Sequence, residues 1–211
     1  TVKTLLELSK FKDDETSAHI TRTQNYVEVI AKYLLSIGEL ENSSKDYIPD
    51  LCKSAPLHDV GKIFITDKIL KKPGKLDADE WEIMKTHVAL GEELLKNISA
   101  DTLAPSGFIL RAIEIAGNHH ENWDGSGYPR GLVGTDIPLE ARLMALADVY
   151  DALTTERIYK KAWTHEAASE EIYRLSGKKF DPDLVFAFGQ AEARFREIAI
   201  ELNDATSVSQ P

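Results

Sequence analysis

The sequence predicts an all-α protein that folds as one helical bundle at about residues 14–202. Apolar residues recur at helical spacing in several segments, and no segment shows the apolar–polar alternation of a strand. Capping residues, glycines and prolines mark the expected starts and ends of these segments. With 211 residues, 43% of them hydrophobic, the chain is long enough for one domain with one sizeable core.

The composition argues against several classes of protein. The formal net charge is −10, whereas a general nucleic-acid binder is usually basic. The single cysteine, Cys52, allows no internal disulfide, so we expect a reducing compartment and cytoplasmic localisation. The sequence shows no signal peptide and no apolar run long enough to insert into a membrane. A phosphate-bearing ligand would need locally concentrated positive charge, which bound metal ions can supply.

The first long helix is expected at about residues 14–37, because Gly38 is a typical helix end. Glu15 and His19 stand four residues apart, so their side chains share one face of this helix. They are either a solvated pair or ligands of a metal ion. Residues 1–13 are expected to form a linker or a short helix.

A second helix is expected from about Lys45 to the pair His58-Asp59, after which Gly61 would let the backbone turn. At a helix end both side chains of the pair can reach one metal cluster, and the two oxygens of Asp59 can bridge two ions. Lys62 then lies within reach of a phosphate oxygen. The alternative is that the pair only caps the end of the helix.

The third helix has a capping box at its start, formed by Asp77 and Glu80. His87 lies in this helix, one turn before Gly91. A glycine inside a helix costs about 1 kcal/mol relative to alanine, so we expect another segment or a ligand to approach closely at Gly91. His87 taken alone would be a surface residue or a satisfied core residue.

A helix at about residues 105–118 ends at the pair His119-His120. The pair is either part of a metal site or a polar helix terminus, where the helix dipole favours a cationic histidine.

The loop at residues 121–137 follows the histidine pair and is rich in glycine. Loops of this length without secondary structure are often functional, and glycine lets main-chain N–H groups approach an anion. Trp123 and Tyr128 offer aromatic surfaces. They either stack on a guanine base or pin the loop to the body of the protein.

Pro138 is typical of the first position of a helix, and Asp148 and Asp151 share one face of that helix. A carboxylate beside an apolar stripe is costly unless it is paired or metal-bound. We therefore expect Asp148 to bind metal and Asp151 to orient a ligand or a water molecule. The stripe itself is formed by Leu139, Leu143, Leu146, Ala147, Tyr150 and Leu153.

Two more helices are expected near the carboxyl end. Thr164 can cap the first of them, whose first residue, His165, is expected to be solvated. Asp181 as the cap and Pro182 at the first position start the last helix. Residues 203–211 are polar and are expected to be a disordered tail.

These candidate ligands, five histidines and two or three aspartates, are too many for one ion. Imidazole nitrogens and carboxylate oxygens suit iron, manganese or zinc. Two ions about 3.5–4 Å apart can bridge a water molecule, lower its pKa and stabilise charge on phosphoryl oxygens. The expected chemistry is thus phosphodiester hydrolysis by a metal-bridging hydroxide.

Three runs of sequence resemble the HD-GYP domain, a bacterial subgroup of the HD metal-dependent phosphohydrolases. They are His-Asp-x-Gly-Lys at 58–62, His-His-Glu-x-x-Asp-Gly-x-Gly-Tyr-Pro at 119–129 and Leu-Ala-Asp-Val-Tyr-Asp-Ala-Leu at 146–153. The resemblance extends from about residue 15 to about residue 182. It implies two or three divalent ions, with iron or manganese favoured and zinc as an alternative.

The resemblance also implies roles for individual residues. The expected metal ligands are His19, His58, Asp59, His87, His119, His120 and Asp148, with Glu15 holding a third ion. Asp59 and Lys62 are expected to be catalytic. The substrate contacts would be Lys62, Tyr128, Pro129, Arg157 and Lys160, although the last two could also be solvated surface cations.

The implied substrate is cyclic di-GMP, hydrolysed to pGpG, GMP or both. Three alternatives stay open: a preference for cyclic GMP-AMP, a catalytically weak sensing or protein-docking module, and a general hydrolase of other nucleotides. The chain begins at Thr1 without a methionine, so we expect it to be part of a longer protein, and the resemblance implies an N-terminal sensory or receiver domain there. A GGDEF-domain protein or a second copy of the chain is a further expected partner.

Overall fold

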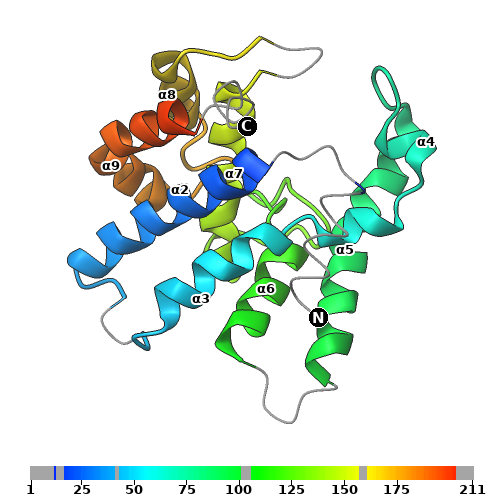
Figure 1. Ribbon diagram of the computed structural model, residues 1–211, viewed down its shortest axis with the longest axis horizontal. Helices are drawn as coiled ribbons and strands as arrows, with labels where there is room; N and C mark the ends of the chain where they lie inside the picture. Colours follow the sequence, from blue (N-terminus) through cyan, green and yellow to red (C-terminus); the bar gives the residue numbers. More distant parts are fainter. Residues whose placement is uncertain (1–11, 13–16, 41–42, 101–105, 157–160, 203–211) are drawn as a thin grey trace, which may run out of the picture.

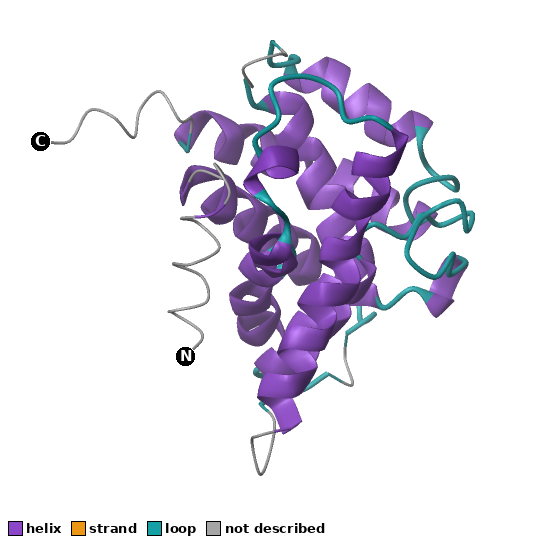
Figure 2. Cartoon of the chain, turned by 90° about the vertical axis from the view of Figure 1, so that its right-hand side faces the viewer, coloured by secondary structure: helices purple, strands orange, loops and turns teal. Residues whose placement is uncertain are grey.

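The computed structural model describes residues 12, 17–40, 43–100, 106–156 and 161–202, which form a bundle of helices joined by loops (Figures 1 and 2). These ranges contain no strand, only the isolated bridges Asp124–Val133 and Ser176–Phe180. The prediction of an all-α fold is confirmed. The expected tail at 203–211 and nearly all of the expected linker at 1–13 lie outside the described residues.

The helices follow one another along the chain with short 3-10 turns between some of them. The helices are α2 (Ser17–Ser36), α3 (Tyr47–Ser54), α4 (Asp67–Leu70), α5 (Ala78–Ala100), α6 (Gly107–Asn118), α7 (Leu139–Thr154), α8 (His165–Arg174) and α9 (Pro182–Glu201). The 3-10 turns are η1 (Ala55–Leu57), η2 (Val60–Phe64) and η3 (Gly134–Asp136).

The larger of two hydrophobic clusters joins α2 to α7, α8 and α9. Tyr26 of α2 stacks on Phe195 of α9 with ring centroids 4.6 Å apart, and Tyr150 of α7 meets both rings edge to face. The predicted stripe of α7 is buried at Leu143, Leu146, Ala147 and Tyr150. Figure 1 shows α2 and α9 side by side with α7 behind them.

The smaller hydrophobic cluster packs α5 and α6 against the turns η1 and η2. Its buried members are Leu57, Val60, Leu95, Ile109, Ala112, Ile113 and Ala116. The segment between η1 and η2 is therefore held firmly between α5 and α6. This segment carries His58 and Asp59.

The second helix differs from the expectation. It ends at Ser54, and His58 and Asp59 lie between two 3-10 turns rather than at the end of one α-helix. The predicted role of Gly61 as a helix end is wrong, because Gly61 lies inside η2. A Cβ at Gly61 would come 1.9 Å from the carbonyl oxygen of His87, so glycine is needed for close contact with α5.

Gly91 forms the other side of this contact. A Cβ there would lie 3.0 Å from the amide nitrogen of Gly61, so the expected close approach of another segment at Gly91 is confirmed. The two glycines let η2 lie directly on the backbone of α5. This contact brings His87 of α5 next to Asp59.

Most helix starts agree with the sequence. Asp77 and Glu80 form the capping box, each accepting the other's backbone N–H at 2.9 Å. Thr164 accepts from the amide of Ala167, and Asp181 accepts from that of Asp183. The prediction for Pro138 is off by one position, because α7 begins at Leu139 and Pro138 is the residue before it. Its ψ of 140° is extended rather than helical.

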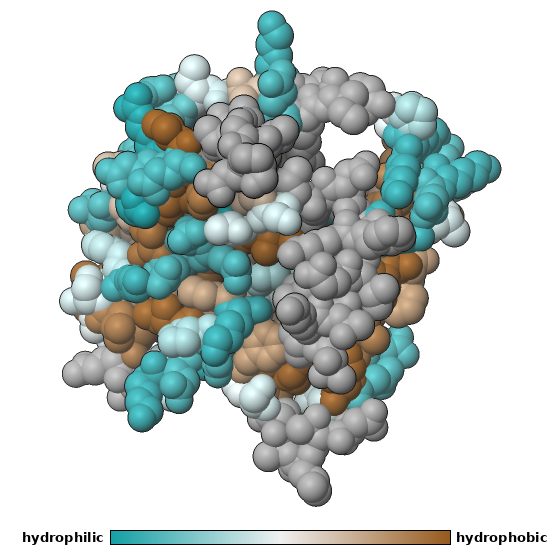
Figure 3. Space-filling model, in the orientation of Figure 1, coloured by the Kyte–Doolittle hydropathy of each residue, from teal (hydrophilic) through white to brown (hydrophobic). Residues whose placement is uncertain are grey.

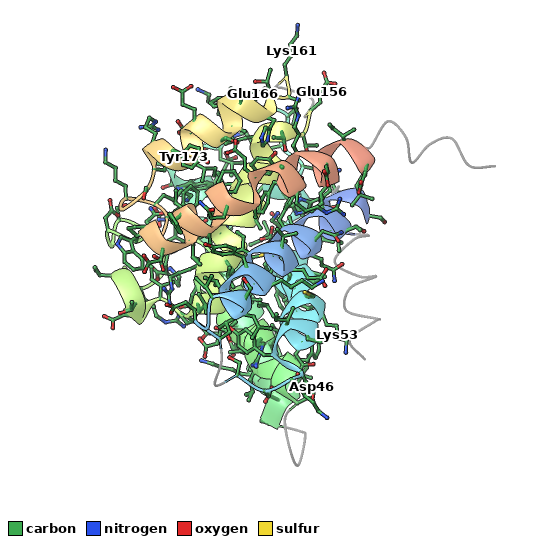
Figure 4. All side chains as sticks on the ribbon, turned by 90° about the vertical axis from the view of Figure 1, so that its left-hand side faces the viewer. Asp46, Lys53, Glu156, Lys161, Glu166 and Tyr173 are labelled. Carbon is green, nitrogen blue, oxygen red and sulfur yellow. The ribbon has the colours of Figure 1, made fainter. Side chains whose placement is uncertain are left out.

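His165 is not the solvated residue that the sequence suggested. Its Nδ1 lies 2.7 Å from the Tyr150 hydroxyl, and its Nε2 lies 3.2 Å from a carboxylate oxygen of Glu192. Tyr173, labelled on α8 in Figure 4, also donates to Glu192. These contacts tie α8 to α7 and α9, and sequence spacing could not reveal them because the partners come from three helices.

Hydrophilic and hydrophobic residues are interspersed on the face drawn in Figure 3. Across the described ranges, each helix is either too short or too polar to cross a membrane.

Candidate metal centre

Two groups of ligand atoms lie next to each other inside the bundle, and within each group all atoms are within 4.8 Å of one another. They bring together the seven predicted metal ligands that fall within the described residues. One group contains Asp59, His87, His119 and His120, and the other contains His19, His58 and Asp148. Five helical segments supply these side chains: α2, the η1–η2 junction, α5, the end of α6, and α7.

Asp59 belongs to the first group and also faces a histidine of the second. Its Oδ1 lies 3.1 Å from Nε2 of His87 and 3.7 Å from Nε2 of His119. Its Oδ2 lies 3.1 Å from Nε2 of His58, in the other group. One carboxylate thus faces ligands of both groups, which is the geometry of a bridging residue.

Three of the histidines are held in one tautomer by the backbone. Nδ1 of His58 lies 2.9 Å from the carbonyl oxygen of Ala55, and Nδ1 of His119 lies 3.1 Å from that of Ile115. His87 makes the same contact with its own helix at 2.7 Å. Because a carbonyl oxygen only accepts, Nδ1 carries the proton in each ring, and the lone pair of Nε2 points toward the cluster.

The buried polar atoms fit a metal ion. Nε2 of His87 and of His119, and Oδ1 of Asp59, are buried and make no hydrogen bond of good geometry within the part of the chain that the structure describes. Buried polar atoms are normally satisfied, and an ion among these three atoms would satisfy them together. The mixed set of imidazole and carboxylate ligands suits divalent iron, manganese or zinc.

The protonation states also suit metal binding, which requires neutral imidazole and ionised carboxylate. Burial lowers the pKa of His119 below its usual value, and burial together with the neighbouring His119 lowers the pKa of His120 well below its usual value. Burial alone would raise the pKa of Asp59, but the ammonium of Lys62, with a smaller contribution from the adjacent His58, outweighs it and holds that pKa well below its usual range.

Lys62 lies at the edge of the centre. Its ammonium is 2.8 Å from Oδ2 of Asp59, one turn away along η2. The sequence predicted that Lys62 reaches a phosphate oxygen, and the structure places its charge beside the predicted bridging carboxylate. A phosphate oxygen bound at the centre would therefore meet this cation.

Asp151 contacts the ring nitrogen of His19 that faces away from Asp148. Its Oδ2 lies 2.8 Å from Nδ1 of His19, so Nε2 of His19 is left on the side of Asp148, 3.9 Å from Oδ1. This is the orienting position that the sequence suggested for Asp151. Although burial raises the pKa of Asp151, hydrogen bonds from His19 and Arg22 outweigh it and keep the pKa below its usual value.

Arg22 was not identified from the sequence. It is buried, and it donates to both oxygens of Asp151, from Nε at 2.6 Å and from Nη2 at 3.0 Å. Nη1 donates to the carbonyl oxygen of Leu202 beyond α9. The spacing of His19 and Arg22 on one helix was visible in the sequence, but their common partner on α7 was not.

Glu121 stabilises the conformation of the glycine-rich loop by accepting hydrogen bonds from its backbone. This buried carboxylate accepts the backbone N–H of Arg130 at 2.7 Å and that of Leu132 at 3.1 Å. A Cβ at Gly127 would come 2.3 Å from the amide nitrogen of Asn122, so the loop closes tightly on itself at that point. The sequence marked Glu121 only as part of a motif and gave it no role.

The two aromatic residues of the loop behave differently. Trp123 fits the pinning alternative, because its backbone N–H donates to Lys179 and its ring faces Arg142 at 5.8 Å. Tyr128 stacks on His120 with ring centroids 4.8 Å apart, and it is followed by the exposed Pro129. Tyr128 thus lies directly beside the candidate metal centre.

Lys179 is a second cation near the centre that the sequence did not single out. Its ammonium donates to Asn122 at 3.1 Å. Burial lowers its pKa, and the charges of Asp148 and Asp124 oppose that effect.

Three predicted site residues, Glu15, Arg157 and Lys160, lie outside the described residues. The structure therefore does not place the predicted third-ion ligand or these two predicted substrate contacts.

Comparisons with known proteins identify a family of which a metal centre of this kind is expected. A family model described as "HD domain" matches residues 5–184. A cyclic di-GMP phosphodiesterase of Vibrio cholerae is 48% identical over 97% of this chain and 42% of its own length. A 3'3'-cGAMP-specific phosphodiesterase 2 of the same organism is 47% identical over 81% of this chain and 30% of its own length. The chain thus spans less than half the length of these curated relatives.

A solved structure shows the same fold. A crystal structure of a cyclic GMP-AMP-specific phosphodiesterase of V. cholerae superposes with a TM-score of 0.62, covering 97% of this chain and 54% of that one. The sequence identity is 19%, so this likeness concerns the fold alone.

Proposed function

Because the chain belongs to the HD domain family, we propose that it is a metal-dependent phosphodiesterase that hydrolyses cyclic di-GMP to pGpG, GMP or both. The observation that carries the proposal is the position of Asp59, whose two oxygens face the histidines of two adjacent ligand groups. Paired metal ions are a common arrangement in enzymes that cleave phosphate esters.

In this proposal each ligand group would hold one divalent ion, and Asp59, which faces both groups, would contribute to both sites. Bound ions would lower the pKa of water and neutralise charge on the phosphoryl oxygens. Iron or manganese is the proposed metal, with zinc as the alternative, and Glu15 is the proposed ligand of a third ion. The histidine rings are already oriented by the backbone, so little rearrangement is needed for metal to bind.

Lys62 is a protein cation whose proposed role is separate from that of the metal ions. Lys62, held 2.8 Å from Asp59, would pair with a phosphate oxygen of the bound substrate. Tyr128 and Pro129 would line the substrate side of the centre, and Arg157 and Lys160 are proposed to contact the phosphates. Positioning and charge neutralisation, rather than a protein nucleophile, would then supply the rate enhancement.

The names of relatives support the choice of substrate class. The relative that is 48% identical is named a cyclic di-GMP phosphodiesterase, and so is one from Thermotoga maritima that is 39% identical over 90% of this chain. A second candidate substrate is cyclic GMP-AMP, because the relative that is 47% identical is named as specific for it. Both are cyclic dinucleotides of purines.

The test compares substrates at equal metal loading. Anaerobically purified protein loaded with Fe²⁺ or Mn²⁺ is incubated with cyclic di-GMP, cyclic GMP-AMP or cyclic AMP, and products are separated by chromatography. Linear pGpG or GMP formed fastest from cyclic di-GMP is the expected result. Faster cleavage of cyclic GMP-AMP would favour the second candidate. Cleavage of neither dinucleotide at full metal content would favour a sensing or docking module.

Some predictions from the sequence concern partners and localisation rather than the catalytic centre. They are a sensory or receiver domain in a longer protein, a GGDEF-domain partner, a homodimer and cytoplasmic localisation.

A further inference from the structure

A row of aromatic rings leads outward from the metal centre. His120, a predicted metal ligand, stacks on Tyr128 with an interplanar angle of 26°. Tyr128 in turn meets Trp81 of α5 edge to face, with ring centroids 6.3 Å apart and an interplanar angle of 78°. Trp81 is therefore two ring contacts away from the centre, on a different segment from the glycine-rich loop.

Trp81 is exposed although its neighbours in the row are largely covered. Trp81 is 46% exposed, whereas Tyr128 and His120 are both partly buried. A tryptophan that only pinned the loop would gain most by burying its ring, since hydrophobic stabilisation grows with the area removed from water. An indole left open beside a candidate active centre is suited to stacking against a flat ligand.

The ring of Tyr128 is fixed from a second direction. Lys85, one turn after Trp81 on α5, places its ammonium 5.8 Å from the centroid of Tyr128 and pairs with Glu82 at 2.8 Å. Tyr128 is thus held by His120 on one segment and by α5 on another. The ring of Tyr128 that Trp81 contacts is therefore held on two sides, so the orientation of Trp81 needs no rearrangement of the glycine-rich loop.

A cyclic dinucleotide requires such a surface. It carries two phosphodiesters and two purines, so a molecule whose scissile phosphate reaches the ligand groups must project its bases away from them. Every base has a π-face, and aromatic side chains bind bases by stacking without reading their identity. Trp81 contacts Tyr128, which contacts the predicted ligand His120, and Trp81 is the exposed ring of the three, so it is available to a base that projects from the centre past Tyr128.

We propose that Trp81 is the stacking platform for one purine of the bound cyclic dinucleotide, with Tyr128 holding its ring in place. The inference rests on the proposed function, because it takes the substrate class from there. It adds a base subsite on α5 to the substrate contacts already proposed at Lys62, Tyr128 and Pro129. Removing the indole should weaken dinucleotide binding about tenfold, within the range of stacking contributions measured by alanine substitution.

The test uses three substitutions that separate stacking from packing. Trp81→Ala removes the ring, Trp81→Leu keeps apolar bulk against Tyr128 but has no π-face, and Trp81→Phe keeps a flat ring. Phe186→Ala is the matched control, since Phe186 is 61% exposed and lies on α9 in a shallow hollow beside Tyr173. Metal content is measured for every variant, so that loss of the centre is seen directly.

Two readouts are taken for each protein: steady-state KM and kcat for cyclic di-GMP, and the Kd of its non-hydrolysable phosphorothioate analogue by calorimetry. The expected result is a roughly tenfold rise in KM and Kd for Trp81→Ala and Trp81→Leu, with kcat and metal content kept. Trp81→Phe should restore most of the affinity. Unchanged Kd in the alanine variant, or full rescue by leucine, would overturn the platform.

The two readouts also separate this inference from the proposed function. If the wild-type protein binds the analogue through Trp81 but does not cleave cyclic di-GMP, the proposed phosphodiesterase activity is contradicted and the stacking role of Trp81 is supported. If wild-type protein cleaves cyclic di-GMP and Trp81→Ala does so with unchanged KM and Kd, the enzyme is supported and the stacking role of Trp81 is contradicted. A wild-type protein that neither binds nor cleaves would contradict both.

Discussion

Asp151 Oδ2 lies 2.8 Å from Nδ1 of His19, so a carboxylate on α7 fixes the orientation of a histidine on α2. The same carboxylate receives two hydrogen bonds from Arg22. The packing of α2 on α7, which builds the hydrophobic core, thereby also prepares a metal ligand.

Replacing Asp151 with asparagine should weaken metal binding. The amide keeps the shape of the side chain but loses the negative charge that faces His19 and Arg22. Partners that orient metal ligands typically contribute about 10–100-fold to metal affinity, and we expect a loss in that range for the ion held by His19. Competition with a chelator measures it, with Asp183→Asn on the exposed start of α9 as control. Equal affinity in both variants would contradict the orienting role.

Replacing Arg22 with methionine should destabilise the fold. The variant leaves the carboxylate of Asp151 buried without its cation, and breaking a buried ion pair in this way costs about 3–5 kcal/mol. Urea unfolding of the metal-free proteins measures the difference. Arg194→Met, which removes an exposed cation from α9, should leave the unfolding midpoint nearly unchanged. Similar midpoints for both variants would show that the Arg22 pair contributes little.

Alanine at position 61 should separate η2 from α5. The new Cβ would lie 1.9 Å from the carbonyl oxygen of His87, so one backbone segment has to move. We expect a destabilisation of about 3 kcal/mol and a loss of bound metal, because His58 and Asp59 would shift away from His87. Ala89→Ser on the exposed side of α5 is the control. Full metal content in Gly61→Ala would show that the contact is not needed for the centre.

Metal binding should persist in mild acid. Burial lowers the pKa of His119 and of His120, so both rings stay neutral below about pH 6.5, where an ordinary histidine takes up a proton. Asp59 stays ionised because its pKa lies well below its usual range. We therefore expect equal metal content after dialysis at pH 6.0 and at pH 7.5. Release of metal with a midpoint near pH 6.5 would indicate ordinary, exposed histidines.

The sequence predicted the features that depend on local spacing. Helix periodicity and the capping box of Asp77 and Glu80 act within a few residues, and the structure has them as expected. Five of the seven candidate ligands stand in short motifs, whereas the ligand roles of His19 and His87 came from the family resemblance; the structure brings all seven together.

Features that depend on contact between distant segments could not be predicted in this way. The role of Gly61 is set by the backbone of α5, and the role of His165 is set by Tyr150 and Glu192. Arg22 reads as one more polar residue of an amphipathic helix until its partner on α7 is known. The 3-10 turns around His58 replace a predicted α-helix because η2 has to fit against α5.

The most direct test of the proposed enzyme is to measure metal content and cyclic di-GMP hydrolysis together, in wild-type protein and in Asp59→Asn. The variant keeps the size of the side chain but removes the charge that faces both ligand groups. We expect the wild-type protein to bind at least two ions per chain and to form pGpG or GMP, and the variant to lose both metal and turnover. Full turnover by Asp59→Asn, or by wild-type protein after complete metal removal, would contradict a centre bridged by Asp59.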